Sequence, residues 1–122
     1  MEEKKKNFLI QNGIDIEKGI ENTLDFETYD EILLDFCNSF PEEVKKFNTY
    51  KINEDWVNYE IIVHALKSNF RTLGFIQEGE LFYQHELAVK ENRINWILEN
   101  YVTLAKEVNR LYKVLLTYKG MN

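Results

Sequence analysis

The chain has 122 residues, of which 44% are hydrophobic and 30% charged, and its formal net charge is −6 at pH 7. These values are typical of one globular domain that buries its own core. The acidic charge excludes the broad basic field that nucleic-acid binding needs. A lone cysteine suits a reducing compartment, and no apolar run approaches the roughly 20 residues that span a bilayer. We therefore expect a cytoplasmic protein with no nucleic-acid or membrane partner.

The beginning of the chain is charged and carries the basic run Lys4-Lys5-Lys6. We expect residues 1–12 to form a solvated tail or lead-in, and residues 13–119 to form one helical domain. A short helix is predicted to start at Asp15, because aspartate is a good N-cap. Its apolar face is formed by Ile16, Ile20 and Leu24.

The second predicted helix begins at Asp25 or at Thr28, where Thr28 and Glu31 fit a capping box. Pro41 removes a backbone hydrogen bond and should kink or split this helix near Phe40. The residues of its buried face are spaced three or four apart, as one face of a helix requires. They are Phe26, Tyr29, Leu33, Phe36, Phe40, Val44 and Phe47.

Three further helices are predicted. The first is capped by Asn53 or Asp55 and closed by Gly74, the second runs from about Gln77 to Glu91, and Asn92 caps the last. Few glycines and one proline favour long helices with short connections. The predicted fold is all-α, an antiparallel four-helix bundle with a short extra N-terminal helix. Because these helices close a bundle within one chain, we expect a monomer.

One stretch carries most of the information about function: Val63-His64-Ala65-Leu66-Lys67-Ser68-Asn69-Phe70-Arg71-Thr72-Leu73-Gly74. It resembles the signature of histidine phosphotransfer domains, which is His-x-Leu-Lys-Gly followed by a glycine that closes the helix. The resemblance covers about Gly13 to Tyr118. It departs at Ser68, where the family usually has glycine, although serine is also small.

This resemblance implies that His64 accepts a phosphoryl group and that Lys67, with Arg71 further away, offsets the phosphoryl charge. Elementary geometry agrees, because His64 falls on the solvent flank of a helix whose buried face includes Val63 and Leu66. Neutral histidine has a ring nitrogen that can attack phosphorus. Glu60 and Ser68 lie one turn before and after His64, and we expect them to border the docking surface for a partner.

His85 needs a separate interpretation. The sequence His85-Glu86-Leu87 resembles the start of the phosphoacceptor box of histidine kinases, but it continues differently and no nucleotide-binding motif is present. His85 shares a helix face with Phe82 and Ala88, so we expect a partly buried core histidine. Phe75 and Ile76, just past Gly74, are expected to belong to an exposed apolar patch.

The leading hypothesis is a phosphorelay carrier that exchanges a phosphoryl group with response-regulator receiver domains, one of them in a hybrid histidine kinase. We expect no enzyme activity, because the metal and the acidic pocket would belong to the receiver, and we expect no cofactor and no metal. The alternative is a helical interaction module with a vestigial site that binds receivers without transfer. A detached kinase dimerisation domain acting through His85 is the third hypothesis.

Overall fold

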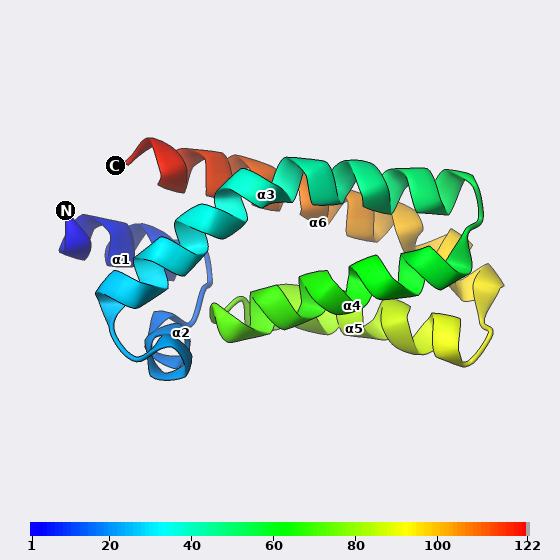
Figure 1. Ribbon diagram of the computed structural model, residues 1–122, viewed down its shortest axis with the longest axis horizontal. Coiled ribbons are helices and arrows are strands. Elements are labelled where there is room, and N and C mark those ends of the chain that lie inside the picture. The colour runs from blue at the N-terminus through cyan, green and yellow to red at the C-terminus, as the bar shows by residue number, and fades with distance from the viewer. Residues whose placement is uncertain (122) are drawn as a thin grey trace.

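The computed structural model describes residues 1–121 and is built from helices (Figure 1). The prediction of an all-α bundle is confirmed. Four long helices run antiparallel in chain order, each beside the next, and the last returns to the first. The helices are α1 (Glu2–Gln11), α2 (Ile16–Thr23), α3 (Phe26–Ile52), α4 (Trp56–Thr72), α5 (Ile76–Lys90) and α6 (Ile94–Gly120).

The expectation of a solvated N-terminal tail is wrong, because residues 2–11 form α1 and pack on the bundle. Lys5 and Leu9 lie one turn apart, and both are buried. The Lys5 ammonium contacts the Asp30 carboxylate of α3 at 3.0 and 3.2 Å. The Tyr118 hydroxyl of α6 donates to the same carboxylate at 2.6 Å. A basic run therefore supplies an ion pair that fixes α1 to two helices.

Three helices begin at an aspartate N-cap. Asp15 is the cap predicted for its helix, and Asp25 and Asp55 are each one of the two caps predicted for theirs. Asp15 accepts from the Lys18 N–H at 3.0 Å, and Asp25 accepts from the Thr28 N–H at 2.8 Å. Asp55 caps α4 by accepting from the Asn58 N–H. A capping box that starts at Thr28 is therefore wrong, because the helix already begins one turn earlier.

Two other expectations concern helix boundaries. Of the two outcomes expected at Pro41, the split is wrong, because α3 is continuous, and the kink agrees with Figure 1, in which the two halves of α3 change direction. Asn92 does not cap α6, because its φ of 55° places it in the turn before the helix and Arg93 occupies the N-cap position. The start of α6 has no side-chain cap.

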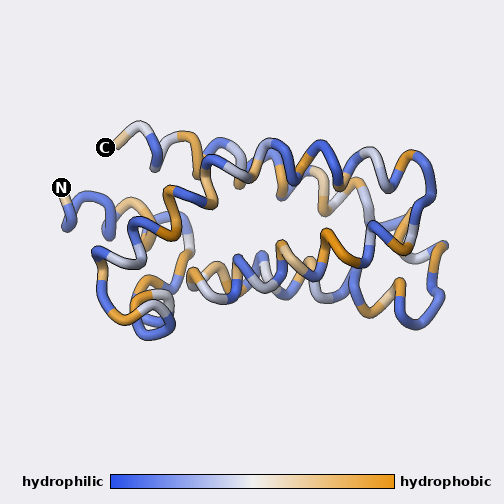
Figure 2. The backbone as a smooth tube through the Cα atoms, in the orientation of Figure 1, coloured by the Kyte–Doolittle hydropathy of each residue, from blue (hydrophilic) through white to orange (hydrophobic). Residues whose placement is uncertain are grey.

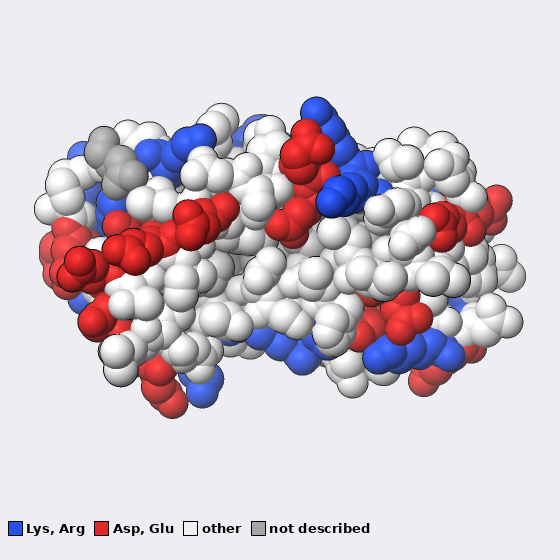
Figure 3. Space-filling view, in the orientation of Figure 1, with Lys and Arg blue, Asp and Glu red and all other residues white. Residues whose placement is uncertain are grey.

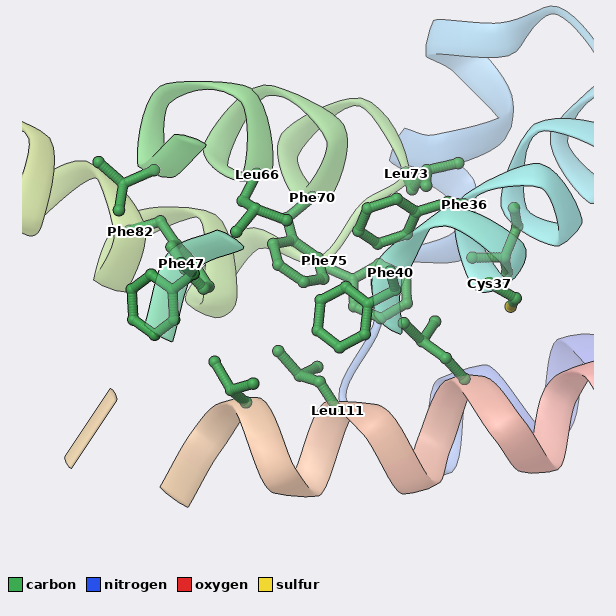
Figure 4. Packing of buried hydrophobic residues seen from close by; sticks show 14 of the residues in the cluster. Phe36, Cys37, Phe40, Phe47, Leu66, Phe70, Leu73, Phe75, Phe82 and Leu111 are labelled. Carbon is green, nitrogen blue, oxygen red and sulfur yellow. The ribbon is translucent and has the colours of Figure 1, made fainter. Parts of the chain in front are cut away.

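The core of the bundle is rich in aromatic rings (Figure 4). Phe70 of α4 lies at its centre, edge-on to Phe36 at 5.1 Å and stacked with Phe82 at 5.5 Å between ring centroids. Such pairs add stability beyond the burial of their area. Figure 2 shows apolar residues recurring among polar ones along the helices, which is the pattern from which the fold was predicted.

The end of α4 is held by the first turn of α3 and by the segment that contains α2. The Tyr29 hydroxyl donates to the Leu73 carbonyl at 2.7 Å, and the Asp15 N–H donates to the Gly74 carbonyl at 2.8 Å. Asn22 donates to the Thr72 carbonyl at 3.2 Å. Carbonyls at a helix C-terminus otherwise lack partners. These contacts fix the helix that carries His64 at one end.

Charges of both signs are distributed over the surface seen in Figure 3, with a row of acidic side chains along the first half of α3. Exposed members of this row are Glu27, Glu31 and Asp35. Within the described residues, no helix combines the length and the apolar character needed to cross a membrane.

Substitution of Gly74 tests the contact between the end of α4 and the start of α2. The φ of Gly74 is +84°, and a Cβ there would overlap the Asp15 carbonyl oxygen, which belongs to rigid backbone. We expect Gly74→Ala to lower the free energy of unfolding by about 3 kcal/mol or more, from left-handed strain and the clash together. Gly13→Ala is the matched control, because Gly13 has a φ of +82° and open space around it. It should cost about 1 kcal/mol, and equal costs in urea unfolding would contradict the predicted clash.

Candidate functional site

His64 lies in the third turn of α4 and points away from the core. Its side chain is 57% exposed. Buried residues of α4, among them Val63 and Leu66, hold the backbone on either side of it. An imidazole on a rigid helix therefore reaches solvent from a fixed position, as the sequence predicted.

A carboxylate that the sequence analysis did not predict holds one nitrogen of this ring. Glu86 of α5 lies across the seam between α4 and α5, and its side chain is only 2% exposed. Its Oε2 atom is 2.6 Å from Nδ1 of His64. Such a short distance is typical of a hydrogen bond with a charged partner. Glu86 therefore fixes the orientation of the ring.

The two contacts at Nδ1 of His64 require opposite protonation states of that nitrogen. The Lys67 ammonium also lies 3.3 Å from Nδ1, and it can only donate. The Glu86 carboxylate can only accept while it is ionised. The shorter contact decides, and Lys67 has a better acceptor in Glu86 Oε1 at 2.6 Å. In the neutral ring Nδ1 therefore carries the proton, and Nε2, which has no hydrogen-bond partner among the described residues, keeps its lone pair.

Burial by itself would raise the pKa of the Glu86 carboxyl, but hydrogen bonds from Lys67, His64 and Lys90 outweigh it and lower that pKa to about 2. Lys90 donates to Oε2 at 3.1 Å from one turn further along α5. Two ammonium groups and one imidazole N–H thus surround a single buried carboxylate. Glu86 therefore stays ionised at neutral pH and accepts the hydrogen bond from the Nδ1–H group of His64.

Lys67 is less exposed than expected for a surface lysine. Its side chain is 12% exposed, because its ammonium turns toward Glu86 and lies 5.3 Å from the centre of the Tyr83 ring. Lys67 is one turn from His64, so its charge adjoins the imidazole, as predicted. In the resting protein this charge is shared with a carboxylate. Lys90, which sequence analysis did not single out, provides a second cation at the same site.

The remaining predicted residues lie around this cluster without joining it. The Arg71 guanidinium stacks over the Tyr83 ring at 4.7 Å and pairs with Glu80 at 3.6 Å. No hydrogen bond or ion pair among the described residues joins Arg71 to His64. Glu60 is partly exposed, and Ser68 is exposed. Gly74 follows the end of α4 with positive φ, in the helix-closing position.

An apolar ridge flanks His64 on the outer surface of α4. Val57 and Ile61 precede the histidine by two turns and one turn, with exposures of 74% and 61%. The expected patch at Phe75 and Ile76 is only half present, because Phe75 is buried while Ile76 is 46% exposed. Phe75 packs against Phe70 in the core.

His85 is a core residue, as predicted, with an exposure of 3%. Burial lowers its pKa to about 4. The Tyr59 hydroxyl lies 2.9 Å from its Nδ1, and burial raises the pKa of that phenol, so Tyr59 is the donor. Trp96 packs edge-on to the imidazole. His85 is therefore a neutral, buried histidine.

One feature of the sequence does indicate that Glu86 is buried and paired. Glu86 shares the buried face of α5 with Phe82, one turn before it, and ionised residues are almost never buried without a partner. A glutamate on an apolar stripe therefore indicates a cation on a neighbouring helix. The sequence alone did not say that this neighbour is Lys67.

Comparison of the chain with models of protein families, with curated proteins and with solved structures found no match. The resemblance to histidine phosphotransfer domains therefore rests on the residues quoted above. Within residues 1–121 no group of three or more histidine, cysteine or acidic side chains is arranged to hold a metal ion.

The pH dependence of stability tests the charge cluster. Because folding lowers the pKa of Glu86 from 4.5 to about 2, the ionised carboxylate stabilises the fold above about pH 4.5, and this stabilisation is lost as the pH falls toward 2. Glu86→Gln should cost about 1–3 kcal/mol at pH 7, and less at pH 3. His85 titrates in both proteins, so its contribution cancels in the difference.

The measurement is urea unfolding of both proteins from pH 7 to pH 3. Glu80→Gln is the matched control on the same helix, because the Glu80 side chain is 57% exposed. It should change stability by less than about 1 kcal/mol at every pH. A cost of Glu86→Gln that stays constant down to pH 3 would contradict the ionised cluster.

Proposed function

We propose that the protein is a histidine phosphotransfer protein of a phosphorelay, with His64 as the phosphoacceptor. The observation that carries the proposal is an exposed imidazole whose Nδ1 is held by a buried carboxylate and whose Nε2 has no partner among the described residues. A nucleophilic nitrogen needs a free lone pair, a fixed direction and access for a partner, and His64 has all three. The resemblance of the surrounding motif supports the same function.

The transfer is a substitution at phosphorus. The Nε2 lone pair attacks the aspartyl phosphate of a receiver domain, an N–P bond forms, and the P–O bond breaks with its electron pair left on the receiver carboxylate. The ring keeps the Nδ1 proton and becomes positively charged. Glu86 stabilises this charge, as a buried carboxylate does for imidazolium in hydrolases. Transfer to a second receiver reverses the steps.

The cations at the site offset the charge of the phosphoryl group. Lys67 lies nearest, within 3.3 Å of the ring, and Lys90 shares the same carboxylate. When the imidazole becomes positive, its hydrogen bond to Glu86 strengthens and competes with both lysines. This competition favours a movement of a lysine ammonium toward the phosphoryl oxygens.

The outer surface of α4 is proposed as the docking face. Val57 and Ile61 offer an apolar surface on one side of His64, and Ser68 keeps the other side low. Glu60 lies on the same helix at the border of this surface. The partners would be the receiver domain of a hybrid histidine kinase and a response regulator, and the location would be cytoplasmic. The acidic pocket and the metal would belong to the receiver, so the chain acts as a carrier.

A receiver-binding module without transfer is the second candidate function. Two observations favour it: Ser68 stands where the resembling family has glycine, and Lys67 is engaged by Glu86 in the resting state. The two functions differ in one result. A carrier becomes labelled by a phosphorylated receiver, whereas a binding module forms the complex and remains unlabelled.

The two histidines separate the proposal from its rivals. His64→Gln should abolish labelling, because glutamine has no nucleophilic ring nitrogen. Its stability should stay within about 1 kcal/mol of the original protein, since the side chain is exposed and an amide still donates to Glu86. His85→Gln should lose about 1–3 kcal/mol through its buried contacts and still accept phosphate.

The measurement is transfer of radioactive phosphate from a phosphorylated receiver, at a temperature where circular dichroism shows both variants folded. The label should be lost in acid and survive in base, as expected of a phosphoramidate. Acid-stable label, or label that persists in His64→Gln, would overturn the proposal.

Lys67 and Lys90 form a matched pair for the role of charge. Lys67→Ala should slow transfer and also cost about 1–3 kcal/mol, because its largely buried ammonium is one of three donors to Glu86. Lys90→Ala removes a donor whose side chain is 52% exposed and should cost less than about 1 kcal/mol. A Lys67→Ala protein with an unchanged transfer rate would show that Lys67 serves only the fold.

A further inference from the structure

The outer flank of α6 carries a second apolar stripe that the bundle does not use. Leu98, Val102 and Leu116 are 42%, 60% and 61% exposed, and Tyr112 is 38% exposed. With Ala105 and Asn109 between them, these residues are spaced alternately by four and three. This is the spacing of the contact positions in a coiled coil. The stripe consists of Leu98, Val102, Ala105, Asn109, Tyr112 and Leu116.

The stripe is complementary to itself when it is reversed. If two copies of α6 pack antiparallel about an axis between Ala105 and Asn109, Leu98 faces Leu116 of the second copy and Val102 faces Tyr112 of the second copy. Large apolar residues then meet near both ends. The small Ala105 lies near the axis, where it allows the two helices to approach closely.

Charges beside the stripe follow the same symmetry. Glu99 and Lys113 are exposed, and neither has an ion pair or hydrogen bond among the described residues. In the antiparallel arrangement Glu99 of each copy lies near Lys113 of the other, which gives two opposite-charge pairs. Lys106 falls near the axis and faces Lys106 of the second copy. Salt screens the repulsion between these two exposed ammonium groups. In a parallel arrangement Glu99 would lie near Glu99 of the second copy, and Lys113 near Lys113 of the second copy.

A cavity lies beside the Leu116 end of the stripe. Where Pro41 bends α3, a cavity of about 80 Å³ opens between α3 and α6. Its walls include Phe40, Pro41, Tyr112 and Leu116. Leu98 of a second copy would lie over this cavity, because it faces Leu116. An apolar side chain inserted between neighbouring residues in this way is the usual contact of packed helices.

We propose that the protein forms a homodimer through the antiparallel pairing of its α6 helices. This replaces the monomer expected from the closure of the bundle. It does not depend on the function proposed for His64. The stripe lies on the α3–α6 side of the bundle and His64 on the α4–α5 side, so both histidines of the dimer stay open to partners.

Light scattering and sedimentation of the full chain over a concentration series test the proposal. We expect the mass of two chains at concentrations on the order of 10–100 µM. Val102→Glu buries a carboxylate against Tyr112 and should raise the dissociation constant about tenfold or more. Val57→Glu is the matched control on α4, with similar exposure, and should leave the dimer intact. A single-chain mass throughout, or equal effects of the two variants, would overturn the proposal.

The register has its own tests. Glu99→Lys and Lys113→Glu should each weaken the dimer a few-fold, and the double exchange should restore it, because both pairs are then rebuilt with reversed sign. Mixing Leu98→Cys with Leu116→Cys under oxidation should give a disulfide-linked dimer, while each variant alone should not. Both variants are made with Cys37 replaced by serine, because Cys37 also lines the cavity over which Leu98 of the second copy would lie. Crosslinking of Leu98→Cys to itself, or a double exchange that fails to restore the dimer, would overturn the antiparallel pairing.

Discussion

A carboxylate buried at the seam between two helices must find donors, and this requirement determines how α4 and α5 face each other at the site. Glu86 receives hydrogen bonds from Lys67 and His64 on one helix and from Lys90 on its own. Sliding either helix by a turn would leave an ionised group without partners, at a cost of several kcal/mol. The packing of the aromatic core and the satisfaction of Glu86 therefore select the same register.

The two histidines show how one fold gives the same side chain opposite properties. His64 and His85 are on neighbouring helices, and each uses Nδ1 to contact another side chain. The partner of His64 is an ionised acceptor, so the proton stays on Nδ1 and Nε2 is nucleophilic. The partner of His85 is a phenol that donates, and the buried ring packs edge-on against Trp96. The same residue type is therefore exposed at one position and buried at the other, with opposite hydrogen-bond roles at Nδ1.

The repeating spacing of apolar residues was sufficient to predict the four long helices and the exposure of His64, because periodicity reports which face of a helix is buried. It failed for α1, where Lys5 is buried by an ion pair with Asp30 that lies 25 residues away. It also failed for Lys67 and Glu86. Lys67 looks like a surface residue on its own helix, and Glu86 lies on an apolar face with no partner on that face; only the meeting of α4 with α5 shows that they share a buried interaction.

Every side chain of the cluster around His64 projects from within a helix. None depends on a loop, so the conformational entropy of arranging the site is lost when the chain folds and not when a partner arrives. A partner that needs no rearrangement of this surface would bind at a rate set by diffusion and orientation. The lifetime of the complex, and hence the choice between partners, would then depend on how fast each one leaves.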